Sequence, residues 1–217
     1  MNARYLVLAA VAVAMVSSTA LYAQNQEQEP MTFFITSSDQ SADYGGLTGA
    51  DALCQRLAAA AGAGDNTWHA YLSTQGAGAV NARDRIGSGP WHNASGVRIA
   101  ANVADLHGDV ERDRNYLFGD TALDENGDAV PGRGSQPQNK HDILTGSDSR
   151  GMAMTGDGDH TCSNWTNASE GSAQLGHHDR SGGNTTSWNS AHGSRGCGLE
   201  ALNGSGGAGK LYCFAVD

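Results

Sequence analysis

The sequence has few positive charges for its length. It contains 13 lysines and arginines against 23 aspartates and glutamates, which gives the 217 residues a formal net charge of −10 at pH 7. Proteins that bind nucleic acids or heparin need a basic face, so this balance argues against both functions. Charged residues make up only 17% of the chain and tryptophans occur throughout it, so we do not expect wholesale disorder.

Several motifs that mark common enzymes and metal sites are absent from the sequence. There is no Gly-x-Ser-x-Gly nucleophile motif and no His-Glu-x-x-His zinc motif. No cysteines have Cys-x-x-Cys spacing, which leaves a zinc ribbon or a thioredoxin-type site without support. The 30 glycines follow no Gly-x-y period, which excludes a collagen helix. A catalytic role would rest on polar composition alone, so a non-enzymatic role is favoured.

The one long apolar run lies at the N-terminus, at residues 5–16. It follows a short positive start and precedes small residues, and it is too short to span a bilayer. We therefore expect a signal peptide at residues 1–23, cut after Ala23 or Ala20, with a membrane anchor as the alternative. Residues 24–30 are polar and are expected to form a flexible leader. The mature chain is expected to be secreted or periplasmic, with no membrane span.

The cysteines agree with export. All four lie in the mature chain, and an even number in an oxidising compartment predicts two disulfides. Four cysteines allow three pairings, and free thiols are the alternative. The cysteines are Cys54, Cys162, Cys197 and Cys213.

Residue patterns in the mature chain indicate an α+β domain. Residues 50–61 are strong helix formers, with Thr48 as the expected N-cap and Gly62 as the stop. Between about 105 and 208 the chain is mostly Gly, Asp, Asn and Ser without periodicity, which predicts long loops. Strands are predicted at residues 32–36, 68–73, 97–101 and 211–216.

Several of these segments resemble a known family. The run from Gly45 to Cys54, followed by Trp-His-Ala-Tyr-Leu-Ser at 68–73, is similar to the helix and second strand of endostatin, the C-terminal domain of certain non-fibrillar collagens. Residues 145–151, 162–166 and 171–174 match its central part. Over residues 31–217 the resemblance implies a C-type-lectin-like fold. That fold has one main helix on a small mixed or antiparallel sheet, long Gly-rich loops and two disulfides.

The resemblance also implies how the cysteines pair. It favours a nested arrangement, with Cys54–Cys213 outside and Cys162–Cys197 inside. The sequential pairing, Cys54–Cys162 with Cys197–Cys213, is the main rival. The zinc site of endostatin uses an N-terminal histidine cluster, and residues 24–36 contain no histidine, so that site is not carried over.

Calcium-dependent lectins of this fold suggest a second candidate site. Gln-Pro-Gln-Asn at 136–139 and Trp-Asn-Ser at 188–190 stand in the order of the two lectin tripeptides, and Cys197 follows. Gln138 and Ser190 replace the carboxylates there, and calcium needs several charged oxygens. Any ligand is therefore expected to bind without calcium.

Histidines provide a third candidate. His177, His178 and Asp179 are consecutive, with His192 nearby, and His160 could join them; histidine with carboxylate suits zinc. Adjacent residues of a strand point to opposite faces, so His177 and His178 cannot both bind one ion from a regular strand. Solvated loop histidines without an ion are the alternative.

Together these observations predict an exported, non-catalytic binding module. Its long loops are expected to recognise an extracellular or envelope glycan or protein. No cofactor is predicted, with zinc or calcium as the alternatives. A metal-dependent hydrolase built on the His/Asp loop and a structural envelope protein are the competing functions. The expected ligand-binding residues are Trp188, Asn189, His177, His178, Asp179 and His192.

The acidic balance predicts weak or no retention of the mature domain on a heparin column at physiological salt. Negative charge opposes the approach of a polyanion within a Debye length of about 8 Å. Elution well above physiological salt would show instead that local arginines outweigh the net charge.

Overall fold

The computed structural model describes residues 28–109, 115–182 and 185–217. The expected signal peptide, residues 1–23, and residues 24–27 of the leader lie outside this part. The end of the leader contacts the domain, because the Gln28 side chain donates a hydrogen bond to the Ala94 carbonyl. Among the helices of the described residues, none has the length and apolar character needed to cross a membrane.

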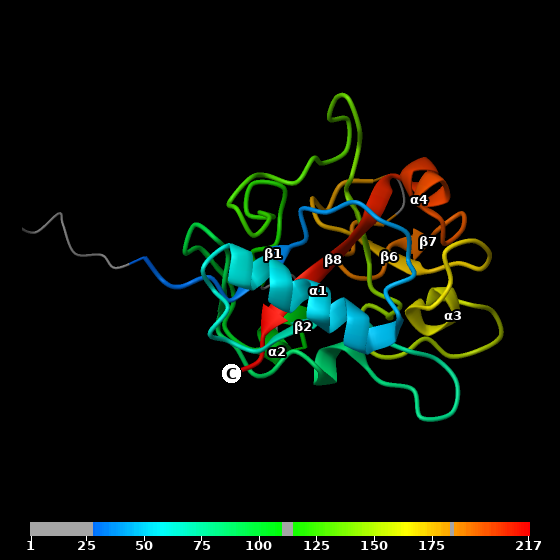
Figure 1. Ribbon diagram of the computed structural model, residues 1–217, viewed down its shortest axis with the longest axis horizontal. Helices are drawn as coiled ribbons and strands as arrows, with labels where there is room; N and C mark the ends of the chain where they lie inside the picture. Colours follow the sequence, from blue (N-terminus) through cyan, green and yellow to red (C-terminus); the bar gives the residue numbers. More distant parts are fainter. Residues whose placement is uncertain (1–27, 110–114, 183–184) are drawn as a thin grey trace, which may run out of the picture.

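The fold is built around one mixed sheet. Its strands are β1 (Phe33–Ile35), β2 (Trp68–Ala70), β5 (Asp142–Leu144), β6 (Gln174–His177), β7 (His192–Gly193) and β8 (Gly207–Ala215). β8 lies in the middle: it pairs antiparallel with β1 and β2 near its end and parallel with β5 near its start. β6 and β7 extend the sheet beyond β5. Figure 1 shows β8 crossing the centre of the molecule beside helix α1 (Gly46–Ala60).

The smaller elements lie in the connections. β3 (Trp91–His92) and β4 (Arg98–Ala100) form a separate two-stranded sheet. The others are a 3-10 turn, η1 (Ala82–Asp84), and the short helices α2 (Val103–His107), α3 (Cys162–Trp165) and α4 (Leu199–Ser205). The chain is therefore mixed α+β with two disulfides, as predicted.

The central sheet is covered on both faces. Along β8, Leu211 and Cys213 belong to the core on the α1 side, whereas Tyr212 and Phe214 belong to the core on the other side. This alternation is what a strand produces, because successive side chains point to opposite faces. All nine residues of β8 are buried, which explains why residues 211–215 form an uninterrupted run of apolar and aromatic side chains.

The structure contains a strand at each of the four predicted places, but the long middle segment was misjudged. Residues 105–208 were expected to be loops, and they contain β5, β6 and β7 as well as α3 and α4. These strands have two to four residues each, and Asp, Gln, Gly and His occupy most of their positions, so they lack an apolar or β-branched run. Their pairing with one another and with β8 produces them.

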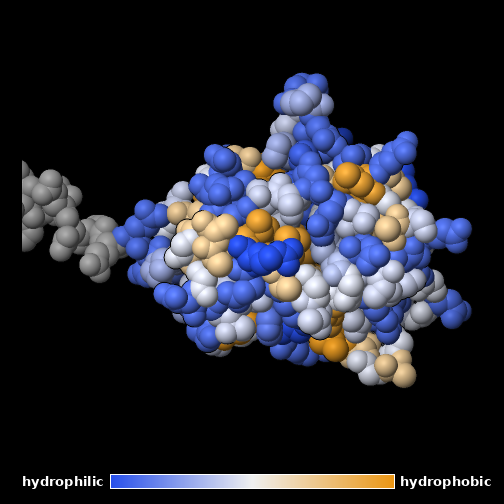
Figure 2. All heavy atoms as spheres, viewed as in Figure 1, coloured by the Kyte–Doolittle hydropathy of each residue, from blue (hydrophilic) through white to orange (hydrophobic). Residues whose placement is uncertain are grey.

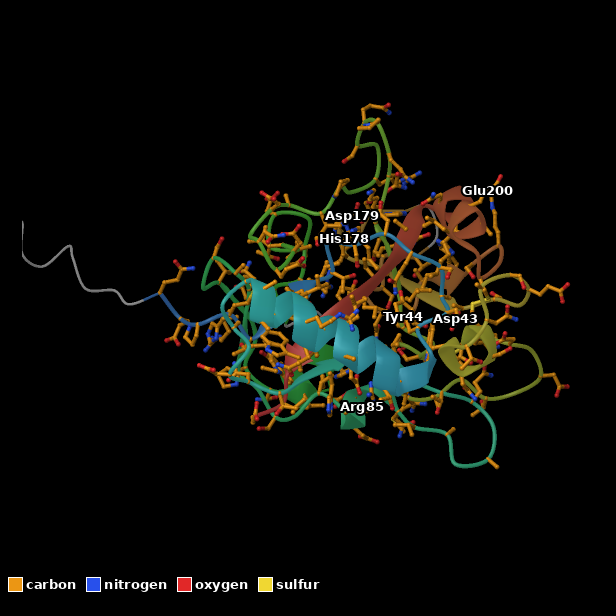
Figure 3. The ribbon with its side chains drawn as sticks, in the orientation of Figure 1. Asp43, Tyr44, Arg85, His178, Asp179 and Glu200 are labelled. Carbon is orange, nitrogen blue, oxygen red and sulfur yellow. A yellow bond between two sulfur atoms is a disulfide. The ribbon has the colours of Figure 1, made fainter. Side chains whose placement is uncertain are left out.

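The predicted start of the main helix was also wrong. α1 begins at Gly46, and its N-cap is Gly45 with φ of 76°, a conformation that favours glycine; Thr48 lies inside the helix. The chain enters closely past Tyr44, since a Cβ on Gly49 would lie 1.7 Å from the Tyr44 carbonyl oxygen. The Tyr44 N–H donates to the Trp165 carbonyl at 3.0 Å, which fixes this approach. Figure 3 labels Tyr44 near the start of α1.

The disulfides are nested. Cys54 on α1 is joined to Cys213 on β8, and Cys162 is joined to Cys197. The sequential alternative is not the arrangement of this protein. The outer disulfide ties the main helix to the central strand, so it links the α1-side core directly to the sheet.

The inner disulfide holds a left-handed turn. Residues 162–165 form α3, yet each has a positive φ, between 49° and 67°. Left-handed conformation costs roughly 1–2 kcal/mol for each residue that is not glycine. The turn is anchored by the disulfide, by Trp165 Nε1 donating to the Ser73 carbonyl at 2.8 Å, and by the Ser163 N–H donating to Asp159.

We expect the outer disulfide to contribute more stability than the inner one. Links between residues 159 and 35 apart in sequence remove about 5 and about 4 kcal/mol of unfolded-state entropy on the chain-entropy model. Urea unfolding of Cys54→Ala/Cys213→Ala and Cys162→Ala/Cys197→Ala measures both losses. The reverse ranking would show that loss of the left-handed turn outweighs the length of the closed loop.

Candidate metal centre

A cluster of histidines around one aspartate lies at the β5–β6–β7 end of the sheet. The register places Asp142 of β5 opposite His177 of β6, and His192 of β7 opposite Leu175. Side chains two residues apart on a strand share a face, so these three side chains share the face of Leu144 and Leu175 in the α1-side core. His141, just before β5, joins them from the adjoining loop.

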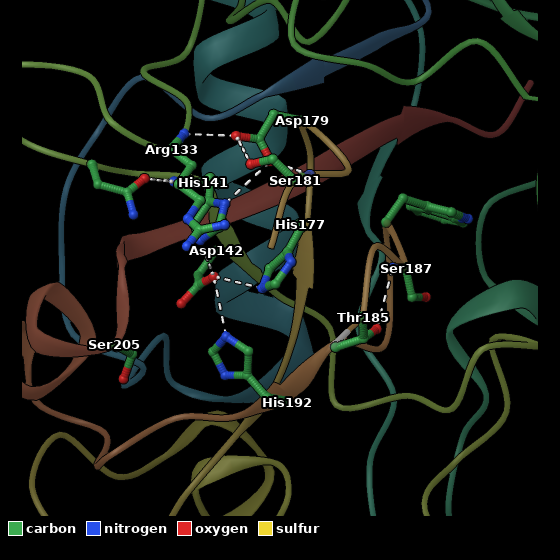
Figure 4. A network of polar contacts seen from close by, with 12 residues as sticks. Arg133, His141, Asp142, His177, Asp179, Ser181, Thr185, Ser187, His192 and Ser205 are labelled. Atoms are coloured by element: carbon green, nitrogen blue, oxygen red, sulfur yellow. Dashed lines mark hydrogen bonds and ion pairs between the residues drawn. The ribbon is translucent and has the colours of Figure 1, made fainter. Parts of the chain in front are cut away.

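Three imidazole nitrogens approach a single carboxylate oxygen. Asp142 Oδ1 lies 3.1 Å from His141 Nε2 and 3.3 Å from His177 Nε2. His192 Nε2 is the third, at 3.6 Å (Figure 4). Bonds of 2.0–2.1 Å to a tetrahedral zinc ion place neighbouring ligand atoms roughly 3.3 Å apart. The contacts of Asp142 Oδ1 with His141 and His177 have this spacing, and the ligand atoms of these three residues lie within 4.8 Å of one another. His192 is not part of that close set.

Asp142 and His177 are buried without hydrogen-bond partners. Their side chains are 0% and 5% exposed. Within the described part of the chain, the two carboxylate oxygens of Asp142 and the two ring nitrogens of His177 all lack a hydrogen-bond partner. An uncompensated buried carboxylate costs several kcal/mol, so this environment favours a cation beside Asp142.

Asp179 supports the cluster from behind His141. His141 Nδ1 lies 3.1 Å from Asp179 Oδ1, and Asp179 also accepts hydrogen bonds from the Arg133 N–H and from Ser181. Burial raises the pKa of Asp179, but the hydrogen bonds from His141, Arg133 and Ser181 outweigh it and hold the pKa below its usual value. The anionic carboxylate favours a proton on Nδ1, which leaves His141 Nε2 free to bind a metal.

Glycines make room for the aspartate. Gly206 has φ of 116°, and a Cβ there would lie 3.2 Å from Asp142 Oδ2 and 3.3 Å from His141 Cδ2. A Cβ on Gly207 would lie 2.9 Å from the Asp142 Cβ. Larger residues at the start of β8 would therefore crowd the cluster.

The His141 and His177 rings are stacked in this state. Their centroids are 4.3 Å apart and their planes differ by 14°. The lone pair of an imidazole nitrogen lies in the plane of the ring, so the two rings have to tilt apart to share one ion. Binding is thus expected to change the orientation of these rings more than the strands beneath them.

The structure brings together three of the six residues expected from the sequence. His177 and His192 contact Asp142, and Asp179 contacts His141. His178 is not among the residues that contact Asp142. Burial lowers its pKa to about 4, so it is neutral at pH 7. His160 is also separate, and its N–H donates to Gln75 Oε1.

The other two expected ligand residues lie in the core on the far side of the sheet. The Trp188 ring packs against Tyr71 and Tyr212 at centroid distances of 5.0 and 5.4 Å. Asn189 Nδ2 donates to Tyr71 Oη at 3.0 Å. Both residues are buried, since Trp188 is 5% exposed and Asn189 is 1% exposed. Their side chains therefore contact other protein groups rather than an external ligand.

The motif at residues 136–139 also uses a side chain in an internal hydrogen bond. Asn139 Oδ1 accepts a hydrogen bond from the His141 N–H at 3.1 Å. With Asn189 buried beside Tyr71, the amides of both motifs are engaged in internal hydrogen bonds. On the face in Figure 2, hydrophobic residues form small separate patches among hydrophilic ones, so that face offers no broad apolar surface.

Sequence reasoning missed His141 and Asp142. They stand directly before Ile143 and Leu144, a short apolar pair that is the only local sign of a strand in this region. A His-Asp pair at the start of a strand would have been a usable signal if the strand had been recognised. Their proximity to His177 and His192 depends on pairing between segments some 35 and 50 residues apart, which a local pattern does not contain.

Comparisons with models of protein families and with curated proteins gave no match. The assignment of the cluster therefore depends on its own geometry and chemistry.

We expect Asp142→Asn to leave the unfolding free energy of the chelator-treated protein unchanged or to raise it by about 1–3 kcal/mol. The substitution keeps the shape and removes a buried carboxylate that has no hydrogen-bond partner in the described chain. Asp179→Asn is the matched control, and it is expected to destabilise the protein because that carboxylate is fully hydrogen-bonded. Denaturant unfolding at pH 8 measures both. A large loss for Asp142→Asn would show that protonated histidines already neutralise the carboxylate.

Proposed function

We propose that this protein is an exported, non-catalytic binding module that holds a divalent transition metal ion, zinc in the first place. The observation that carries the proposal is the approach of three imidazole nitrogens to one buried carboxylate oxygen that lacks a hydrogen-bond partner in the described chain. The proposed ligands are His141, Asp142, His177 and His192.

The donor set favours zinc over calcium and magnesium. Calcium takes six to eight oxygen ligands and magnesium prefers an octahedral shell of oxygens and water. Imidazole suits zinc, copper, iron and nickel, and zinc combines nitrogen with carboxylate oxygen in a tetrahedral shell. One carboxylate and three histidines meet that requirement and leave a net charge of +1 in the inner shell.

The number of ligands supports binding rather than catalysis. Zinc sites with four protein ligands are structural, whereas catalytic ones keep a position for water or substrate. His141, Asp142 and His177 offer ligand atoms within 4.8 Å of one another, and His192 Nε2, 3.6 Å from Asp142 Oδ1, is the proposed fourth ligand that closes the shell when an ion binds.

We further propose that the domain is an endostatin-like member of the C-type-lectin-like class, secreted or periplasmic after removal of its signal peptide. The antiparallel pairing of β1 with β8 near the two ends of the domain and the nested disulfides support this assignment. The two disulfides and the N-terminal apolar run support export.

Zinc titration of the chelator-treated mature protein tests the metal proposal. We expect one zinc ion to bind per chain and to raise the melting temperature as the free zinc concentration rises. Asp179→Asn should weaken binding roughly 10–100-fold, as loss of an outer hydrogen-bond partner does, and Asp142→Asn should weaken it further. His160→Asn, outside the cluster, should bind as the wild type does. Equal affinities for all four proteins, or no stoichiometric binding, would reject the proposal.

A further inference from the structure

The four proposed ligands are not equivalent. The side chains of His141, Asp142 and His177 are 7%, 0% and 5% exposed, and one ligand atom from each lies within 4.8 Å of the others. The His192 side chain is 39% exposed, and its nitrogen is the farthest of the three from Asp142 Oδ1. The cluster is thus a buried set of three with one surface member.

His192 also has the weakest structural support. It lies on β7, a two-residue strand at the edge of the sheet, whereas Asp142 and His177 lie on strands paired within it. Apart from Asp142, its ring contacts the His177 ring edge-on at a centroid distance of 5.0 Å, and its Nδ1 lies 3.0 Å from the Gly193 carbonyl oxygen. Figure 4 shows His192 on the opposite side of the Asp142 carboxylate from His141. A change of rotamer would therefore move the His192 ring into solvent with little disturbance to the sheet.

We propose that His192 is an exchangeable ligand, and that the metal uses its position to bind an external ligand carrying a carboxylate group. This inference rests on the proposed function and names the ligand class of the same site. In the exchange the metal–Nε2 bond breaks and its electron pair stays on His192. A carboxylate oxygen donates an electron pair to form the new bond, and no proton or electron is transferred.

Charge favours an anion at this position. With a divalent ion, one carboxylate and neutral imidazoles, the inner shell carries +1, and replacing the neutral His192 by a carboxylate brings it to zero. A neutral inner shell is favoured in a buried site, where charge is poorly screened. The partner is thus expected to present an acidic side chain or an acidic sugar at the β7 edge of the domain.

Cobalt(II) in place of zinc, with acetate as the probe, tests the exchange. The visible absorption of cobalt(II) responds to its ligands and coordination number. Wild-type protein should bind one cobalt ion, and its spectrum should change saturably with acetate. His192→Ala should still bind cobalt, and its apparent Kd for acetate should be at least about 10-fold lower, because no internal ligand competes for the position. His160→Asn should titrate as the wild type does.

The outcomes separate the two proposals. Loss of all cobalt binding in His192→Ala, with a native circular dichroism spectrum, would make His192 an integral ligand and overturn the exchange. Equal acetate affinities for wild type and His192→Ala, or no spectral response to acetate in either, would also overturn it while leaving metal binding intact. Absence of cobalt and zinc binding in the wild type would reject the proposed function and this inference with it.

Discussion

The pairing of β8 with strands on both of its sides is the constraint on which the rest of the structure depends. β8 receives β1 and β2 near its end, β5 near its start, and the outer disulfide through Cys213. Its Lys210 is 2% exposed, and its ammonium donates to the carbonyls of Thr36 and Ser37. The last strand in sequence therefore fixes the first strand, the main helix and the middle of the chain at once.

The proposed metal centre follows from that pairing. β5 aligns parallel with the first residues of β8, β6 aligns on β5 and β7 aligns on β6, so the positions of Asp142, His177 and His192 are set by successive pairings within one sheet. The left-handed conformation of Gly206 lets α4 pass directly into β8 beside the aspartate. Only His141 reaches the cluster from outside these strands, and Asp179 holds it there.

The sequence predicted those elements whose cause is local. β-branched and aromatic runs indicated β1, β2, β4 and β8, and an alanine-rich run indicated the helix. The helix start at Gly46 was missed because the cause is a close approach of Tyr44 and two glycines with positive φ, rather than a capping side chain. β5, β6 and β7 were missed because they exist through pairing with distant segments. Two of the four proposed ligands, His141 and Asp142, were missed with them. The run of two histidines and an acid at residues 177–179 could be recognised without knowledge of the strands.

The polar cluster occupies the part of the sheet face that the main helix does not cover. On that face Leu144 and Leu175 belong to the apolar core. Two residues away along each strand, the next side chains on the same face are Asp142 and His177. α1 packs mainly against β2, so it does not cover this end of the sheet. Apolar residues at these two positions would extend the core and avoid the desolvation of a carboxylate, and they would be expected to stabilise the fold. Retaining an aspartate without a hydrogen-bond partner in the described chain, surrounded by imidazoles, is costly for stability, and the proposed cation would offset that cost.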